Sequence, residues 1–231
     1  TGEEYGGHAF WDTELFMLPF FAWVFPKTAQ NLENYRYYLL DAARENAHKN
    51  GFNGAQYPWE SADDGSEQCP DWTIEPDGSC YRCYVAVYEH HVTAAVAYGI
   101  YDYVKITGDI DFLYTKGAEI LTETARFWAS RCEYNNEQDR YEINQVTGPD
   151  EWHEPVNNNL YTNYLARWNL KYVLSLLEVM KKKRLLHIMN LLKKQDLQRW
   201  KLLNGKKFRK NLIFHAKKER NFLNSSKDIL N

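Results

Sequence analysis

Cysteine, proline and long apolar runs are all scarce in this chain. Only four cysteines and seven prolines occur among its 231 residues. No stretch approaches the roughly 18 consecutive apolar residues that a membrane-spanning helix needs, so we expect no membrane partner. The chain also opens at Thr1 without a leader-like apolar run, and we interpret it as an internal fragment. The missing leader therefore says little about export.

The cysteines offer little support for a metal or redox site. Cys80-Tyr-Arg-Cys83 is the single suggestive spacing, and a zinc site would need a second pair of ligands. The nearby His90 and His91 can be imagined in that role. However, the intervening Tyr and Arg and the absence of another Cys-x-x-Cys favour two packed thiols. We therefore predict no metal site.

Aromatic residues, by contrast, are abundant. They make up 16% of the chain, with eight Trp and seventeen Tyr. A helical core does not need so many, because aliphatic residues would fill it equally well. Side chains with an apolar face and a polar tip suit a ligand that has both apolar faces and hydroxyls. At 44% hydrophobic residues, the chain is long enough for one large domain with a substantial core.

Charge divides the chain near residue 180. Residues 181–231 hold sixteen Lys and Arg against three Asp and Glu, which leaves residues 1–180 strongly acidic. For this basic tail, the hypothesis that we favour is translation in a shifted frame of an AT-rich gene. There are two alternatives. The tail is either a genuine cationic helix pair that continues the preceding helix, or an arm that binds nucleic acid. We expect no nucleic-acid partner, and the encoding DNA decides between these hypotheses.

Apolar residues at helical spacing predict an all-α fold for residues 1–180. The expected helices span residues 28–49, 85–106, 109–132 and 161–179, and an aromatic segment at 14–25 is bent by Pro19 and ended by Pro26. Residues 67–83 are expected to be an irregular excursion. Helical hairpins joined by loops of uneven length favour an α/α toroid over a compact bundle.

Two loops carry a Trp next to an acid. Trp11-Asp12 and Trp59-Glu60 each offer an indole face for the apolar side of a sugar and a carboxylate for its hydroxyls. The alternative for the first pair is a core Trp and a helix-capping Asp. For His91 and Thr93, on the predicted helix 85–106, a satisfied polar residue in the core is as good an interpretation as ligand contact.

The most informative stretch is Gly148-Pro-Asp-Glu-Trp-His-Glu-Pro-Val-Asn-Asn-Asn159. Glycine and prolines constrain this turn, and the asparagines offer a cap for the next helix. Its carboxylates therefore lie on a rigid loop at a helix end, where catalytic side chains are commonly presented. A solvated acidic turn is the alternative interpretation. We take Glu151 as its chemical centre.

Four blocks, in order, make the chain resemble the catalytic domain of glycoside hydrolase family 65, the inverting α-glucoside phosphorylases of the maltose, trehalose, kojibiose and nigerose types. The blocks are Gly7-His-Ala-Phe-Trp-Asp-Thr-Glu14, Gly54-Ala-Gln-Tyr-Pro-Trp-Glu-Ser61, Thr124-Ala-Arg-Phe-Trp-Ala-Ser130, and Gly148-Pro-Asp-Glu-Trp-His-Glu154 with Asn158-Asn-Leu-Tyr-Thr-Asn163. The resemblance fades after Glu178. It implies that residues 1–180 form part of an (α/α)₆ barrel.

The resemblance also implies roles for individual residues. Glu151 is expected to be the general acid, kept protonated by Trp152 and by neighbouring acids. Trp11 and Asp12 would line the subsite of the transferred glucose, and Trp59, Glu60 and, with less support, Thr93 would lie near the leaving sugar. Inorganic phosphate would attack from the opposite face, so that an α-linked disaccharide yields β-glucose 1-phosphate without another cofactor.

Departures from the family pattern keep alternatives open. Ala95 stands where the family often has Asp, and neither the family's Lys-Gln pair nor its phosphate-binding Ser/Thr/His loop is found. An inverting hydrolase of the same family and an inactive fragment that at most binds sugar are therefore alternatives. For the full-length protein, we expect a cytoplasmic homodimer.

Overall fold

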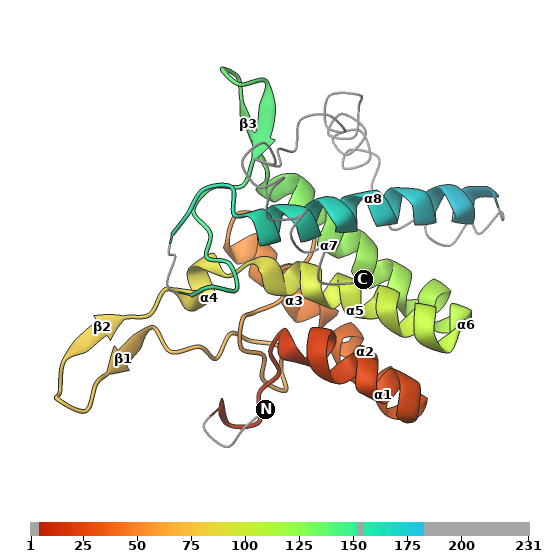
Figure 1. The fold of residues 1–231 in the computed structure, drawn as a ribbon, viewed down its shortest axis with the longest axis horizontal. Helices are drawn as coiled ribbons and strands as arrows, with labels where there is room; N and C mark the ends of the chain where they lie inside the picture. The colour runs from red at the N-terminus through yellow and green to blue at the C-terminus, as the bar shows by residue number, and fades with distance from the viewer. Residues whose placement is uncertain (1–4, 152–154, 183–231) are drawn as a thin grey trace, which may run out of the picture.

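The computed structural model describes residues 5–151 and 155–182 (Figure 1). Its helical elements are η2 (Thr13–Met17), α1 (Leu18–Val24), α2 (Pro26–Tyr38), α3 (Leu40–Lys49), α4 (Val85–Tyr88), α5 (His91–Thr107), α6 (Ile110–Phe112), η3 (Leu113–Gly117), α7 (Ala118–Arg131) and α8 (Leu160–Lys182), where η denotes a π-helical turn. The mostly helical prediction is confirmed, whereas the partial (α/α)₆ barrel stays a prediction. Within the described residues, none of these helices has the length and apolar character to cross a membrane.

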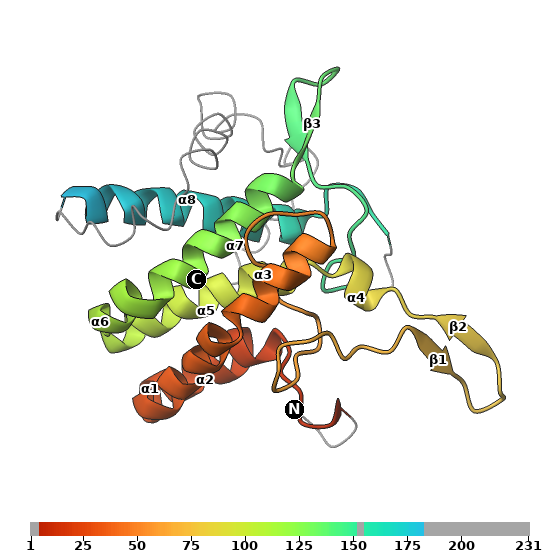
Figure 2. The ribbon, with the colours of Figure 1, turned by 180° about the vertical axis from the view of Figure 1, so that it is seen from behind.

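Helix α5 lies at the centre of the fold, between α1 and α2 on one side and α7 and α8 on the other (Figures 1 and 2). Ala94, Ala95, Ala97 and Gly99 are fully buried on it. These small side chains let the neighbouring helices approach closely. At Gly99, an added Cβ would lie 2.9 Å from both the Glu14 and the Glu33 side chains. The small residues of α5 therefore make room for charged groups as well as for apolar ones.

Those charged groups form a buried cluster between η2 and α2. Arg36 donates from Nε to Glu14 Oε1 at 2.5 Å and from Nη2 to Glu14 Oε2 at 3.0 Å. Its Nη2 also donates to the carbonyl of Phe10 at 3.1 Å. Burial, together with the charge of Glu14, raises the pKa of Glu33 well above its ordinary value, which favours the neutral form of that side chain. The ion pair of this cluster is the one between Arg36 and Glu14.

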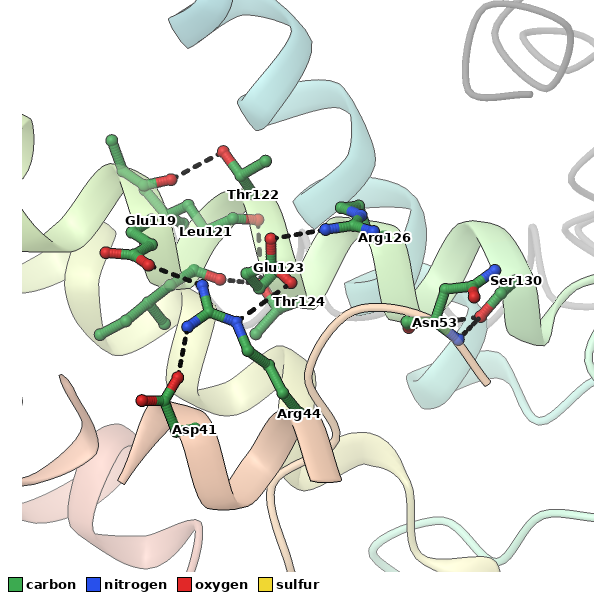
Figure 3. A network of polar contacts seen from close by, with 12 residues as sticks. Asp41, Arg44, Asn53, Glu119, Leu121, Thr122, Glu123, Thr124, Arg126 and Ser130 are labelled. Carbon is green, nitrogen blue, oxygen red and sulfur yellow. Dashed lines mark hydrogen bonds and ion pairs between the residues drawn. The ribbon is translucent and has the colours of Figure 1, made fainter. Parts of the chain in front are cut away.

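A second polar network joins α3 to α7 (Figure 3). Arg44 donates to Asp41 on its own helix at 2.7 Å and to Glu119 on α7 at 2.6 Å, and its Nε lies 3.4 Å from Glu123 Oε2. Just after α3, the backbone N–H of Asn53 donates to the hydroxyl of Ser130 at 2.9 Å. These contacts fix the point from which the segment carrying Trp59 and Glu60 departs.

The predicted helix 85–106 is two helices. It is interrupted at Glu89, whose backbone (φ −88°, ψ 68°) leaves the helical region. The carbonyl of Tyr88 accepts a hydrogen bond from the N–H of Thr147, on the loop that leads to Glu151. The interruption is therefore stabilised by a tertiary contact that helical spacing cannot reveal. Similarly, the predicted helix 28–49 is divided at Leu39 into α2 and α3.

The expectation of an irregular segment at 67–83 is wrong. Strands β1 (Trp72–Ile74) and β2 (Cys80–Arg82) form an antiparallel hairpin, and β3 (Glu133–Asn135) and β4 (Arg140–Glu142) form another. Each strand has only three residues, too few for alternation to show in the sequence. The all-α prediction therefore needs these two projecting hairpins added (Figure 1).

The predicted pairing of thiols is also corrected. The sulfur of Cys83 lies 3.9 Å from that of Cys69, while Cys80 is exposed on the hairpin. All four cysteines are free. Across residues 5–151 and 155–182, no three His, Cys, Asp or Glu side chains are grouped as a metal site would require.

Helix α8 extends to Lys182, so the first two residues of the predicted tail are helical. Residues 183–231 lie outside the described residues, as do Trp152, His153 and Glu154. The hypotheses on the frame, the helix pair and nucleic-acid binding of the tail therefore stay predictions.

Gly54 and Gly51 offer a matched test of how α3 and α7 are joined. Both have φ of +81°, but an added Cβ at Gly51 meets nothing, whereas at Gly54 it lies 2.5 Å from the backbone nitrogen of Phe127. We expect Gly51→Ala to lower the free energy of unfolding by about 1–2 kcal/mol through backbone strain alone. Gly54→Ala should cost about 1–3 kcal/mol more, because α7 must also shift. Equal losses in denaturant titrations of the two variants would refute this account.

Acid should destabilise the fold through His90. Its Nε2–H donates to the carbonyl of Val87 at 2.9 Å, so Nδ1 accepts from Arg131 Nε at 3.2 Å. Burial first, and then the charge of Arg131, lower the pKa of His90 to about 3. The unfolded chain binds this proton near pH 6.5, so stability falls as the pH drops from about 6.5 toward 3, by about 1.4 kcal/mol per pH unit.

The measurement is the free energy of unfolding between pH 7 and pH 4. His90→Gln keeps a donor and an acceptor in place but cannot titrate, so its slope should be smaller by about one proton. His48→Gln, at an exposed position, is the control and should keep the parent slope. A His90→Gln slope equal to that of the parent would show that His90 does not contribute.

Candidate functional site

A cleft of about 880 Å³ opens among the loops. Five of the six residues predicted to form the site line it: Trp11, Asp12, Trp59, Glu60 and Glu151. Those residues come from three segments far apart in the sequence. The cleft also has apolar walls, to which Phe10 and Val85 contribute. Its volume falls within the range of sites for small molecules.

Trp11 and Asp12 lie in the turn that precedes η2. The turn is fixed by the buried Arg36, which donates to the carbonyl of Phe10 and to the carboxylate of Glu14. Trp11 is half-buried, and Asp12 is exposed. Asp12 occupies the capping position of η2, but its side chain makes no capping hydrogen bond. The capping interpretation of Asp12 is thus not supported, and Asp12 is one of the residues that line the cleft.

Trp59 and Glu60 are aligned with the first pair by backbone hydrogen bonds. The N–H of Ala9 donates to the carbonyl of Ser61 at 3.0 Å, and the N–H of Ser61 donates to the carbonyl of Ala9 at 2.9 Å. The ring of Trp59 packs edge-to-face against Phe10, with centroids 5.9 Å apart. The two Trp–acid pairs therefore belong to one rigid unit.

His91 forms the base on which both indoles rest. Its ring is fully buried, and its centroid lies 5.2 Å from that of Trp11, 5.7 Å from that of Trp59 and 5.6 Å from that of Tyr161. Burial lowers the pKa of His91 to about 4, so the imidazole is neutral at neutral pH. Of the two interpretations left open by the sequence, the packed core residue is the one that this geometry favours.

Thr93 is not brought to the cleft. It is fully buried, and its hydroxyl accepts a hydrogen bond from the N–H of Tyr57 at 3.1 Å. Val85, one helix earlier, lines the cleft instead. Thr93 thus supports the segment that leads to Trp59. Thr93 was placed near the cleft because residues 85–106 were predicted to be one helix. The break at Glu89 divides that helix and changes which of its residues face the loops.

Two polar contacts to the second pair were not predicted. His8 Nδ1 lies 2.7 Å from Glu60 Oε1, across 52 residues of sequence. The carboxylate of Glu67 accepts hydrogen bonds from the N–H groups of Trp59 at 2.7 Å and of Glu60 at 3.0 Å. His8 belongs to the first motif block, which offered a signal. Glu67 belongs to no motif, and nothing in the sequence marks it.

Glu151 lies at the tip of a loop whose two ends are joined. Val146 and Val156 exchange backbone hydrogen bonds of 3.0 and 2.8 Å, and the side chain of Asn158 accepts from the N–H of Ile143 at 3.2 Å. Asn159 caps α8 by accepting from the N–H of Thr162 at 3.0 Å, as predicted. Glu151 itself is exposed. Its expected neighbours Trp152 and Glu154 lie outside the described residues.

The position of Gly148 is constrained by the same loop. An added Cβ there would collide with the side chain of Asn159. The glycine thus allows the loop to pass directly over the start of α8. An exposed carboxyl group on this anchored loop can reach a ligand held between the two indoles. Such a set of groups suits a sugar, whose apolar faces stack on aromatic rings and whose hydroxyls bind carboxylates.

The sequence of the chain matches a known family. Residues 1–228 match the glycosyl hydrolase family 65 central catalytic domain. The matched range is longer than the motif resemblance, which ended near Glu178. A kojibiose phosphorylase from Caldanaerobacter subterraneus subsp. tengcongensis is 58% identical over 180 residues, which cover 78% of this chain and 23% of that protein.

Two further relatives are informative. A kojibiose hydrolase from Flavobacterium johnsoniae is 44% identical over 172 residues, covering 74% of this chain and 24% of that protein. The solved structure of a putative kojibiose phosphorylase from the human microbiome superposes with a TM-score of 0.73 at 32% identity, covering 87% of this chain and 28% of that one. The chain thus spans about a quarter of the length of the curated relatives that it matches.

Proposed function

Because the chain belongs to glycosyl hydrolase family 65, we propose that the protein containing it is an inverting phosphorylase of an α-linked glucose disaccharide. One observation carries the proposal: Glu151 shares a single cleft with both Trp–acid pairs. The phosphorylase named above, at 58% identity, supports the reaction type. Its name also makes kojibiose the first disaccharide to test.

In this mechanism the chain supplies one catalytic carboxyl group. Glu151 gives its proton to the glycosidic oxygen as the bond from that oxygen to the anomeric carbon breaks. Inorganic phosphate, the second substrate, forms a new bond to that carbon from the opposite face, so the α-linkage yields β-glucose 1-phosphate. An inverting enzyme needs an acid on one face and an attacking group on the other. Phosphate takes the place of a second carboxylate.

Binding would divide between the two Trp–acid pairs. We assign Trp11 and Asp12 to the glucose that is transferred, and Trp59 and Glu60 to the sugar that leaves. A disaccharide between the indoles would also cover Glu151, which is exposed in the free structure. Such burial disfavours the charged carboxylate and so favours the protonated acid that the first step requires.

Hydrolysis is the second candidate, and a specific observation favours it. The relative named kojibiose hydrolase matches nearly as much of this chain as the phosphorylase does. A hydrolase would use a carboxylate base to activate water, and such a base would come from outside the described residues. The absence of a further cofactor, the homodimer and the cytoplasmic location stay predictions for the full-length protein.

The reaction type can be decided with the full-length protein. Incubation with kojibiose, maltose or trehalose and inorganic phosphate should release β-glucose 1-phosphate, seen by phosphorus and proton NMR, and no sugar should be cleaved when phosphate is left out. Kojibiose is the substrate that we expect to react fastest. Release of glucose at the same rate without phosphate would reject phosphorolysis and establish the hydrolase.

The role of Glu151 is tested by Glu151→Gln, which removes the proton that the leaving oxygen needs. We expect kcat to fall by about 10²–10⁴-fold, while KM changes little. Asp150→Asn is the matched control, because it makes the same change from a carboxyl group to an amide at the adjacent position of the same turn. Its kcat should stay within about tenfold of the parent. Equal losses in the two variants would argue against Glu151 as the acid.

A further inference from the structure

The carboxylate of Glu67 joins three backbone amides of one loop. Its Oε2 accepts from the N–H of Trp59 at 2.7 Å, and its Oε1 accepts from the N–H of Glu60 at 3.0 Å and of Cys69 at 3.1 Å. Both oxygens are therefore occupied by donors. Hydrogen bonds from N–H groups to an ionised acceptor are about twice as strong as those between neutral groups.

The same loop is closed by its own backbone. The N–H of Gln68 donates to the carbonyl of Glu60 at 3.0 Å, and Ser61 and Glu67 form an antiparallel bridge. On the other side, the hydroxyl of Tyr35 donates to the carbonyl of Ala62 at 2.7 Å. The Trp59-Glu60 backbone is thus fixed from both sides. Glu67 is the side chain that accepts hydrogen bonds from the backbone N–H groups of Trp59 and Glu60.

Three N–H donors suit a carboxyl group, because both of its oxygens accept hydrogen bonds here. A glutamine would keep one acceptor oxygen but would turn an NH₂ group toward a backbone N–H, so that two donors would face each other. Glu67 is half-buried, and burial raises its pKa while the backbone donors oppose that rise. A charge in such a setting needs its three hydrogen bonds, because a buried polar group without a partner is costly.

The other Trp–acid pair is held by a different group. Arg36 acts on the turn that carries Trp11 and Asp12, through the carbonyl of Phe10 and through Glu14. Glu67 makes no hydrogen bond to that turn in the described structure, since its partners are the amides of Trp59, Glu60 and Cys69. The two halves of the cleft therefore have separate supports.

We propose that Glu67 is a positioning residue for the leaving-sugar side of the cleft and acts through Trp59 and Glu60. The proposal rests on the proposed function for the identity of that sugar. The structural part does not depend on the reaction, because it concerns amides in the free protein. A change at Glu67 should therefore loosen one subsite and leave the glucose subsite as it is.

The first experiment needs no activity. Hydrogen exchange of the full-length protein is followed in peptides that contain the amides of Trp59, Glu60 and Cys69. In Glu67→Gln these amides should exchange at least about tenfold faster than in the parent. Asp64→Asn is the matched control, since Asp64 lies in the same loop and accepts its hydrogen bonds from the N–H and the hydroxyl of Ser66. It should leave these amides unchanged. Unchanged exchange in Glu67→Gln would overturn the proposal.

The second experiment runs the reaction toward synthesis. With β-glucose 1-phosphate and an acceptor sugar, Glu67→Gln should raise KM for the acceptor about tenfold and change KM for β-glucose 1-phosphate by less than about twofold. Asp64→Asn should change neither value. Equal increases in both KM values would indicate a general disturbance and would reject the proposal.

Failure of the function and failure of the inference give different results. A parent protein that makes no disaccharide rejects phosphorolysis, while the exchange experiment still decides the role of Glu67. Should Glu67→Gln lower the melting temperature too far for assay, Glu67→Asp keeps the charge at a shorter reach. It should then show a smaller rise in acceptor KM and in exchange, and parent-like values for both would overturn the proposal.

Discussion

The ion pair between Arg36 and Glu14 is the interaction on which the architecture of the cleft depends. Both side chains are almost completely removed from solvent, so each charge would be costly without the other. The guanidinium has a further bond to the carbonyl of Phe10, which links α2 directly to the turn before η2. Helix α5 accommodates the cluster only because Gly99 lacks a side chain. Core and binding surface are thus parts of one assembly.

The sequence predicted the long helices well and their interruptions poorly. Helical spacing identifies residues that face the core, but the break at Glu89 arises because Tyr88 bonds to Thr147, 59 residues later in the chain. The two hairpins were missed for a different reason, since strands of three residues carry no usable alternation. A tertiary contact thus accompanies the helix break, whereas the hairpins are local and simply too short to show a pattern.

The same distinction applies to the site. A Trp next to an acidic residue is a signal that can be recognised locally in the sequence. The two such pairs, Trp11-Asp12 and Trp59-Glu60, do line one cleft together with Glu151. Glu67 and His91 could not be assigned from the sequence, because their roles come from the atoms that surround them. Glu67 is an ordinary loop acid until its oxygens are seen facing backbone amides. The region that would bind phosphate is not among the motifs of this chain, which spans about a quarter of its curated relatives.

The joined base of the Glu151 loop has a consequence for how such a domain changes over time. Two backbone hydrogen bonds between Val146 and Val156 close the loop independently of what lies between them. The asparagine side chains then secure the base to Ile143 and to the start of α8. The described tip residues, 149–151, can therefore change with little effect on the helices, whereas Thr147 and Gly148 are held by Tyr88 and Asn159. A fold of this kind can acquire new specificity by replacing a few tip residues while its scaffold stays the same.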